Sequence, residues 1–428
     1  MRQFFLGSLL VLAACGGGGG GDDSNVTNSA PRISSLSFAP TVVEVGFGGG
    51  LATIIGTFDF ADANGNLSTV TLTVLDDGGT TISTETIGIV GVSGMTQGTI
   101  EGEVLVATTT LGDFTVQVFV TDTTGLRSNT LQGVFSVVEP PWATKSPMPT
   151  TRPGFASAVL GGRIYILGGR DATAPVIPQP PVTTVEVYDP LTDSWSTAPS
   201  MPIAVSEPMA AAINGKLYVV GGHDDFGLET DVVQEFDSTT QSWNVKASMP
   251  EPRAFAAIGT IGGLIYVAAG EGPGVTLNSL VWYDPVTNSW SAGAPSSASR
   301  TGSGGAVVDD RFVVYGGYST AFVPDSGYRR LVESYDPVMD MWSLRSDGEP
   351  RRDFGFVAHG GLVYAFGGNN VARSLDWNQA YDNATDTWIA KQPMPISLGY
   401  VRAESIGDRI YVFGSDQTLE YTPANDRF

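Results

Sequence analysis

Apolar and polar positions follow one repeated pattern over the last two thirds of the chain. Each repeat, of about fifty residues, has a strand of small residues, an apolar strand that ends in a glycine pair or a variant of it, and then a turn such as YDPLTDSW (188–195). Self-similar β-rich units of this period predict a propeller or a solenoid rather than a domain with one core. Aligned on the glycine pairs, the six copies are RPGFASAVLGGRIYILGG (152–169), VSEPMAAAINGKLYVVGG (205–222), RAFAAIGTIGGLIYVAAG (253–270), RTGSGGAVVDDRFVVYGG (300–317), RRDFGFVAHGGLVYAFGG (351–368) and LGYVRAESIGDRIYVFGS (398–415).

The sixth copy lacks its outermost strand. It stops at YTPANDRF (421–428), where Phe428 occupies the position that Trp has in the other copies. A spare copy of such a strand precedes the first repeat, because WATKSPMP (142–149) parallels WSTAPSMP (195–202). We therefore expect residues 142–149 to complete the last unit and to close a ring of six blades over 142–428. Closure removes the exposed sheet edges of an open array.

Residues 31–139 alternate apolar and polar positions in short runs, such as Thr69–Leu75 and Phe114–Thr121, and turn sequences separate these runs. About seven short strands in about a hundred residues are typical of a β-sandwich. One turn region offers oxygen atoms at spacings that suit a calcium ion, although an Asx-rich hairpin turn is the simpler explanation because no bidentate Glu follows. The candidate calcium ligands are Asp59, Asp62, Asn64 and Asn66.

The N-terminal segment has the pattern of a signal peptide. Arg2 precedes an apolar run that is too short to span a bilayer as a helix. The run ends in LAAC (12–15), which contains the only cysteine of the chain and resembles the lipobox of bacterial lipoproteins. This resemblance implies a signal peptide over 1–14, a lipidated Cys15 that holds the protein at a membrane, and a glycine-rich tether over 15–30. The alternative is a plain secretory signal.

Composition and charge narrow the classes of function. Of the 428 residues, 15% are charged, and 44 Asp and Glu against 22 Lys and Arg give a formal net charge of −22. Such an acidic chain repels phosphate backbones, which argues against nucleic acid as a partner. A single cysteine allows no disulfide within the chain, so both predicted domains depend on their β-cores.

Linked motifs point to known families. The glycine pairs, the Tyr/Phe-Asp turns and the spaced Trp residues of 142–428 resemble the kelch β-propellers. DFADANGNLSTVTLTV (59–74) and FTVQVFVTDTTGLRSN (114–129) resemble bacterial immunoglobulin-like or cadherin-like modules. Gly16, directly after the cysteine, resembles the sorting signal of outer-membrane lipoproteins. These resemblances imply an all-β chain in which an immunoglobulin-like β-sandwich precedes a six-bladed kelch-type β-propeller, at the outer membrane and facing the periplasm or the cell surface.

Two repeat positions are expected to line one mouth of the ring, because the start of the first strand and the end of the second share a face in an antiparallel blade. The opening position carries four arginines, which suit bidentate recognition of carboxylates. Alternatively, each arginine pairs with an acidic neighbour (Glu207, Asp353 or Glu271) and braces the ring. The opening set is Arg152, Arg253, Arg300 and Arg351, with Arg352 beside it, and the set after the glycine pairs is Arg170, His223, Glu271, Tyr318, Asn369 and Asp416.

Three residues are candidates on chemical grounds. Glu404 stands where the other repeats have Ala, Gly or Val, so its carboxylate needs a partner or water. His223 is suited to act as an acid or a base. Trp377 departs from the repeat pattern, either as an aromatic contact for a ligand or as packing of the fifth blade.

These features favour a non-enzymatic, membrane-anchored recognition or scaffold protein that binds a protein or carbohydrate ligand at the propeller mouth without a cofactor. The alternative is a mutarotase or epimerase of an acidic sugar such as N-acetylneuraminate, a reaction found among six-bladed periplasmic kelch proteins. In that case the arginines would hold the carboxylate, and Glu404, Glu271 or His223 would act as acid or base. The sequence contains no recognisable nucleophile triad or metal-ligand motif. The oligomeric state is left open.

Overall fold

The structure is a computed structural model of the chain, and it describes residues 12–13, 28–44, 51–107, 111–319 and 327–426. The chain folds into two compact units, residues 1–140 and residues 141–428. The described residues form β-strands and short 3-10 turns such as η2 (Pro423–Asn425), which confirms the predicted all-β class. A helix with the length and apolar character of a membrane span does not occur among them.

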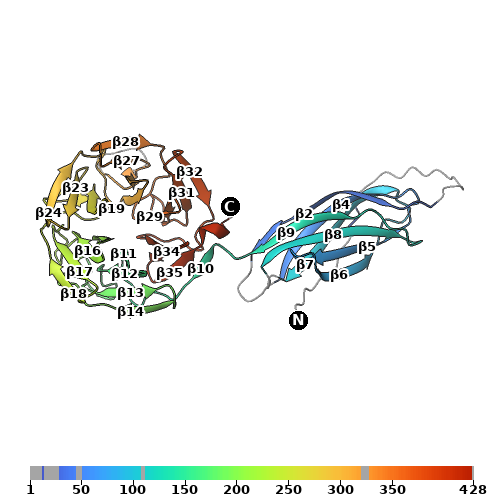
Figure 1. The fold of residues 1–428 in the computed structure, drawn as a ribbon, viewed down its shortest axis with the longest axis horizontal. Coiled ribbons are helices and arrows are strands. Elements are labelled where there is room, and N and C mark those ends of the chain that lie inside the picture. The colour runs from blue at the N-terminus through green and yellow to red at the C-terminus, as the bar shows by residue number, and fades with distance from the viewer. Residues whose placement is uncertain (1–11, 14–27, 45–50, 108–110, 320–326, 427–428) are drawn as a thin grey trace. The chain divides into compact units, whose positions relative to one another are not determined.

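The first unit packs two β-sheets around one apolar core (Figure 1). The strand order is β1-β7-β4-β2 in one sheet and β3-β9-β8-β5-β6 in the other. Alternate residues of β8 are buried, as expected for a strand with one face on the core. The strands are β1 (Leu12–Ala13), β2 (Arg32–Ala39), β3 (Val42–Glu44), β4 (Leu51–Ala61), β5 (Leu67–Leu75), β6 (Thr81–Gly88), β7 (Gln97–Ala107), β8 (Gly112–Asp122) and β9 (Leu131–Val138).

Hydrogen bonds organise the Asx-rich turn after β4. The buried Asp62 accepts the backbone N–H of Asn64 at 3.2 Å on Oδ1 and that of Asn66 at 2.8 Å on Oδ2. Asp59 accepts a hydrogen bond from Thr99 Oγ1 at 2.7 Å. These bonds fit the interpretation of the segment as a turn, and a calcium ion at Asp59, Asp62, Asn64 and Asn66 stays a prediction.

The second unit contains six antiparallel sheets of four strands, which stand around a central axis (Figure 1). The first strand of each sheet lies nearest the axis. The strands are β11 (Ala156–Leu160), β12 (Arg163–Leu167), β13 (Val185–Asp189) and β14 (Ser194–Thr197); β15 (Met209–Ile213), β16 (Lys216–Val220), β17 (Val233–Asp237) and β18 (Ser242–Val245); β19 (Ala257–Ile261), β20 (Leu264–Ala268), β23 (Leu280–Asp284) and β24 (Ser289–Gly293); β25 (Gly304–Val308), β26 (Arg311–Tyr315), β27 (Val332–Asp336) and β28 (Met341–Arg345); β29 (Gly355–His359), β30 (Leu362–Phe366), β31 (Asn378–Asp382) and β32 (Thr387–Lys391); and β33 (Arg402–Ile406), β34 (Arg409–Gly414), β35 (Gln417–Tyr421) and β10 (Trp142–Thr144). A small hairpin, β21 (Glu271–Gly272) and β22 (Val275–Thr276), follows β20.

The last sheet joins the two ends of the second unit. β10 pairs with β35, so that Trp142 lies opposite Tyr421 and Thr144 opposite Leu419. The Trp142 ring is buried against Tyr421, with ring centroids 4.7 Å apart, and against Phe366 of the preceding sheet at 5.7 Å. This strand therefore closes the ring of sheets by non-covalent contacts alone.

The repeated tryptophans link each sheet to its predecessor. Trp195 Nε1 donates to Ser146 O at 2.9 Å, and Trp342 Nε1 donates to Ala294 O at 2.8 Å. Each of these carbonyls lies just after the outer strand of the preceding sheet. The indole N–H groups are therefore used in contacts between sheets and are structural. The same link is made by Trp142, Trp243, Trp290 and Trp388.

Candidate functional site

The four arginines that open the repeats are buried and do not reach the mouth of the ring. Arg152 Nη2 lies 2.8 Å from Glu186 Oε2, and Arg300 pairs with Glu333. Burial lowers the pKa of all four guanidinium groups, and it lowers the pKa of Arg300 to about 10. The prediction of a ligand-binding arginine ring is therefore wrong. The residues that are each 0% exposed are Arg152, Arg253, Arg300 and Arg351.

Three of these arginines bond at the glycine pair of their own repeat, whereas Arg300 donates to Leu331 O, just before the third strand of its sheet. Nη1 of Arg152 donates to Gly168 O at 2.5 Å, and Nη1 of Arg351 donates to Gly367 O at 3.4 Å. Nη1 of Arg253 donates to Ala269 O at 3.1 Å, at the equivalent place in the third repeat. The first three guanidinium groups thus satisfy carbonyls where the second strand ends. They brace the sheets, but not through Glu207, Asp353 or Glu271, which were the expected partners.

The residues that follow the glycine pairs lie beside the residues at the start of the same repeat. Isolated β-bridges join Ser206 to His223, Ala254 to Glu271, Thr301 to Tyr318 and Arg352 to Asn369. The structure therefore brings these predicted residues to one face of the propeller. Asp416, the equivalent residue of the sixth repeat, is exposed in the turn between β34 and β35.

A third ring of residues, which sequence reasoning missed, encircles the axis at this face. Each member lies two residues after the opening position and has a left-handed backbone, with φ between 51° and 71°. Backbone bonds link successive members: Glu207 N–H donates to Gly154 O at 2.6 Å and Asp353 N–H to Gly302 O at 2.8 Å. A left-handed backbone at bulky residues is strained, and such strain concentrates at functional sites. The ring is Gly154, Glu207, Phe255, Gly302, Asp353 and Tyr400.

The two acidic members of this ring hold arginines of the mouth. Glu207 receives two hydrogen bonds from Arg170, at 2.9 and 3.0 Å, and faces His223 Nδ1 at 3.2 Å. Burial acts to raise the pKa of Glu207, but the bonds from His223 and Arg170 lower it below its ordinary value. Asp353 accepts a bond from Arg352 Nε at 2.7 Å, and burial still raises the pKa of Asp353. Arg170 and Arg352 are therefore paired residues of the mouth.

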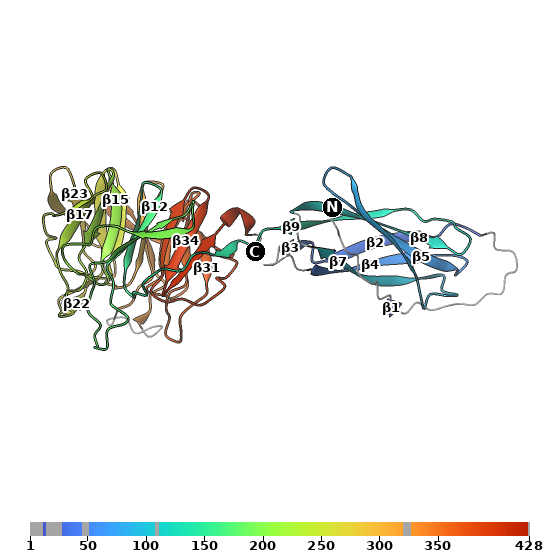
Figure 2. The same ribbon diagram turned by 90° about the horizontal axis from the view of Figure 1, so that it is seen from below.

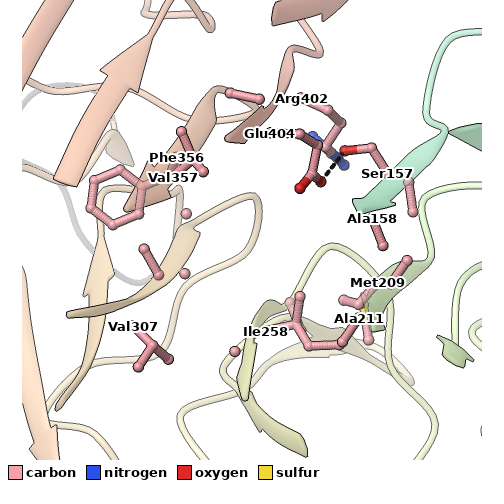
Figure 3. A pocket seen from close by; sticks show the side chains of 18 of the residues that line it. Ser157, Ala158, Met209, Ala211, Ile258, Val307, Phe356, Val357, Arg402 and Glu404 are labelled. Carbon is pink, nitrogen blue, oxygen red and sulfur yellow. Dashed lines mark hydrogen bonds between the residues drawn. The ribbon is translucent and has the colours of Figure 1, made fainter. Parts of the chain in front are cut away.

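A cavity of about 390 Å³ lies along the axis inside the rings, lined by the small side chains of the first strands. Glu404 reaches into it from β33 and accepts a hydrogen bond from Ser157 Oγ of β11 at 2.6 Å, with Arg402 beside it (Figure 3). Burial raises the pKa of Glu404 to about 7, although the Ser157 hydrogen bond and the Arg402 charge lower it. The predicted anomaly at Glu404 is therefore a carboxyl group on the wall of this axial cavity.

The raised pKa of Glu404 predicts that the effect of a Gln substitution on stability depends on pH. Because the folded pKa of about 7 lies above the ordinary value of 4.5, the contribution of Glu404 to stability falls as the pH rises from 4.5 through 7, whereas Gln does not titrate. Glu404→Gln should therefore unfold at a higher urea concentration than the wild type at pH 8, and the advantage should shrink towards pH 5. All eight tryptophans lie beyond residue 141, so their fluorescence reports on the second unit alone. A difference that does not change with pH would contradict this prediction.

Aromatic residues and arginine gather where the fourth and fifth sheets meet at the mouth. The rings of Tyr318 and Tyr328 are 5.5 Å apart, and the guanidinium of Arg352 lies 5.4 Å from the Tyr318 ring. All three side chains are partly exposed. Trp377 instead lies over the buried Arg351, at 5.3 Å, so it packs against the fifth sheet as the alternative interpretation proposed. We call Tyr318, Tyr328 and Arg352 the mouth cluster.

Long loops extend from the same face, as the side view shows near β22 (Figure 2). They connect the second and third strands of the sheets, whereas the opposite face carries the short Tyr/Phe-Asp turns. Each long loop of the first, second, third and fifth sheets exposes a large apolar side chain. These side chains are Ile177, Phe226, Leu228, Val275 and Val371.

His223 and Glu271 come together at the junction of the second and third sheets. A third residue, Glu229, joins them, and the candidate ligand atoms of the three side chains all lie within 4.8 Å of one another. Glu229 was missed from the sequence because its loop position has no counterpart in the other repeats. Its only sequence signal is that it follows His223 within one short loop.

Comparison with known proteins identifies the repeats. Residues 136–317 and 210–415 match the model of the KLHDC2/KLHL20/DRC7 Kelch-repeats domain. The chain belongs to the kelch-repeat family. A solved structure of YjhT has a TM-score of 0.51 over 65% of this chain and 93% of that one, at 16% sequence identity, which shows a shared fold. The predicted kelch repeats and the β-propeller fold are thus confirmed.

Curated relatives share this kelch region at modest identity. Kelch-like protein 25 of Xenopus tropicalis is 28% identical over 269 residues, which are 62% of this chain and 37% of that protein. Alpha-scruin of Limulus polyphemus is 28% identical over 288 residues, which are 64% of this chain and 31% of that protein. The matched region spans only about a third of the length of these relatives.

Proposed function

We propose that this kelch protein is a membrane-anchored recognition protein of the cell envelope, which binds a protein partner at the mouth of a six-bladed propeller. Six four-stranded sheets around one axis support the count of blades. Two sheets that share a core in the first unit support an immunoglobulin-like spacer between the anchor and the propeller. Fold alone leaves function open, so the proposal depends on the residues at the mouth.

The mouth cluster is the observation that carries the proposal. Tyr and Arg are the residues that most often dominate the free energy of binding between proteins, and here they contact one another while remaining partly exposed. Other long loops of this face expose apolar side chains, such as Phe226 of the second sheet and Val371 of the fifth. A repeated structural turn would keep one residue type, whereas the positions after the glycine pairs differ in every repeat.

The enzymatic alternative loses its main support. An enzyme for an acidic sugar was predicted to hold the carboxylate with the arginines of the opening position, and these four side chains are 0% exposed and already paired. Arg170 and Arg352 do not replace them as a carboxylate site, because they are bound to Glu207 and Asp353. A protein partner therefore fits the surface better than an acidic sugar.

The function is tested with the full chain isolated from the cells that make it. Quantitative affinity isolation compares the amount of partner recovered with each protein. We expect at least tenfold less partner with the triple variant Tyr318→Ala, Tyr328→Ala and Arg352→Ala than with the wild type. A control triple variant on the opposite face, Leu191→Ala, Val286→Ala and Val338→Ala, removes side chains that are at least 85% exposed and should keep full recovery. Equal recovery by all three proteins would refute the proposal. Recovery that is abolished by glycosidase treatment would assign a carbohydrate ligand instead.

Membrane anchoring has its own test, since Cys15 lies outside the described residues. Cys15→Ser should abolish metabolic labelling with an alkynyl fatty acid and move the protein from the membrane fraction to the soluble fraction. Two or more acyl chains are needed for stable anchoring, and each buried methylene contributes about 0.8 kcal/mol. A variant that stays in the membrane fraction would show that another segment or a partner holds it there.

A further inference from the structure

A second site, separate from the mouth cluster, is formed by His223, Glu229 and Glu271. His223 follows the glycine pair of the second repeat, Glu229 lies in the same loop, and Glu271 begins the hairpin of the third. Their candidate ligand atoms are all within 4.8 Å of one another, and His223 Nε2 lies 4.0 Å from Glu229 Oε1. Two loops from neighbouring sheets thus bring one imidazole and two carboxylates to a single point.

The histidine is oriented for ligation. Its Nδ1 faces the Glu207 carboxylate at 3.2 Å, and Arg170 holds that carboxylate with two further bonds. An ionised carboxylate only accepts, so Nδ1 donates its proton to Glu207, and in the neutral imidazole this leaves the lone pair of Nε2 for a ligand. The His223 side chain is 9% exposed, and within the described residues Nε2 has no hydrogen-bond partner. A carboxylate behind a histidine that presents its other nitrogen is the usual arrangement around bound metal ions.

We infer that His223, Glu229 and Glu271 bind a divalent transition-metal ion, with Zn²⁺ as the best fit, and that Glu207 positions the imidazole. An imidazole nitrogen selects against Ca²⁺ and Mg²⁺, which take oxygen ligands almost exclusively. Three protein ligands are the number found where Zn²⁺ keeps a fourth position for water or another ligand. The metal would neutralise two carboxylates that otherwise face each other in a chain of net charge −22. This site goes beyond the proposed function and lies on different sheets from the mouth cluster.

The site is tested by titrating the full chain, freed of metal by chelator and carrying no polyhistidine tag, with Zn²⁺ in a calorimeter. One equivalent should bind, and Co²⁺ in its place should give visible absorption bands of a protein-bound ion. Glu229→Gln and Glu271→Gln should each weaken Zn²⁺ binding at least about tenfold, since loss of an outer-shell group alone costs 10–100-fold. These near-isosteric changes are checked for folding by their tryptophan fluorescence in chelator.

Asp416→Asn serves as the matched control, because Asp416 follows the glycine pair of the sixth repeat and is exposed. It should leave Zn²⁺ affinity unchanged, and it retains Cys15, so any contribution of that thiol is present in both proteins. Failure of the wild type to bind one equivalent of Zn²⁺, or equal affinity of the wild type and the Glu229→Gln variant, would overturn the assignment. Stronger binding of Ca²⁺ than of Zn²⁺ would overturn the choice of metal class. No partner enters this assay, so its outcome is independent of the recognition test.

Discussion

Arg300→Ala is expected to lower the free energy of unfolding of the propeller by about 3–5 kcal/mol, because it leaves the Glu333 carboxylate buried without its partner. Both side chains of this pair are at most 1% exposed. Arg300 Nη1 also donates to Leu331 O at 3.0 Å, and that bond is lost as well. Had the arginine been a ligand-binding residue of the mouth, its removal would leave stability nearly unchanged. Urea unfolding followed by tryptophan fluorescence measures the difference on the second unit alone.

Two further variants make this result specific. Arg163→Ala removes an arginine whose pair with Asp189 is solvent-exposed, and it should cost about 1 kcal/mol or less. The double variant Arg300→Met with Glu333→Leu removes both charges and should recover most of the stability lost by Arg300→Ala. A loss for Arg300→Ala no larger than that for Arg163→Ala would contradict the bracing role.

Trp142→Ala is expected to cost about 3–5 kcal/mol, the range for truncation of a buried aromatic side chain. Trp142 joins β10 to β35 and donates from Nε1 to Gln392 O at 3.1 Å, so it contributes to both the sheet pairing and the link to the fifth sheet. Its ring also covers Tyr421 and Phe366. The loss should appear in the same fluorescence-detected urea transition.

Trp142→Phe is the control for this prediction. It retains ring contacts with Tyr421 but loses the hydrogen bond to Gln392, so its loss of stability should be clearly smaller. If Trp142→Ala unfolds at the wild-type urea concentration, closure through β10 does not stabilise the ring, and the account of the last sheet fails.

The kelch propeller was predictable because the constant spacing of the repeats depends on their period and on residue size, and not on the direction in which side chains point. The same register placed the four arginines beside the mouth but could not show which way their long side chains run. A second repeat position contains the missing signal. The second residue of the third strand is Glu186, Glu333 and Gln379 in three arginine-containing repeats, and each contacts its arginine.

The second and third repeats show why that signal is hard to read. The second repeat has Val205 in place of arginine, and the matching Gln234 instead bonds with the backbone of Ile203 at 2.9 and 3.1 Å. The third has Arg253 without a matching acid, and Glu251 and Ser279 serve in its place. Pairing therefore varies from sheet to sheet, and three-dimensional contacts were needed to decide between recognition and bracing.

The third ring, at the mouth, could not be predicted from the sequence for a different reason. Its residues, reading Gly-Glu-Phe and then Gly-Asp-Tyr along the repeats, share backbone conformation rather than chemistry. A positive φ at Glu207 or Phe255 has no sequence signature, since glycine is the residue that normally marks it. The site around Glu207, and with it Glu229, therefore emerged only from the structure.

The claim that recognition occurs at the long-loop face is tested most directly by photo-crosslinking in the cells that make the protein. A photoreactive phenylalanine analogue replaces Phe226 on the long-loop face or Val338 on the opposite face, at sites that are 85% and 89% exposed. The exposed fractions differ by only a few per cent, so chance labelling should be comparable at the two sites. The account predicts a discrete protein adduct from position 226 and none from position 338. Adducts of equal yield at both positions, or an adduct at position 338 alone, would contradict it.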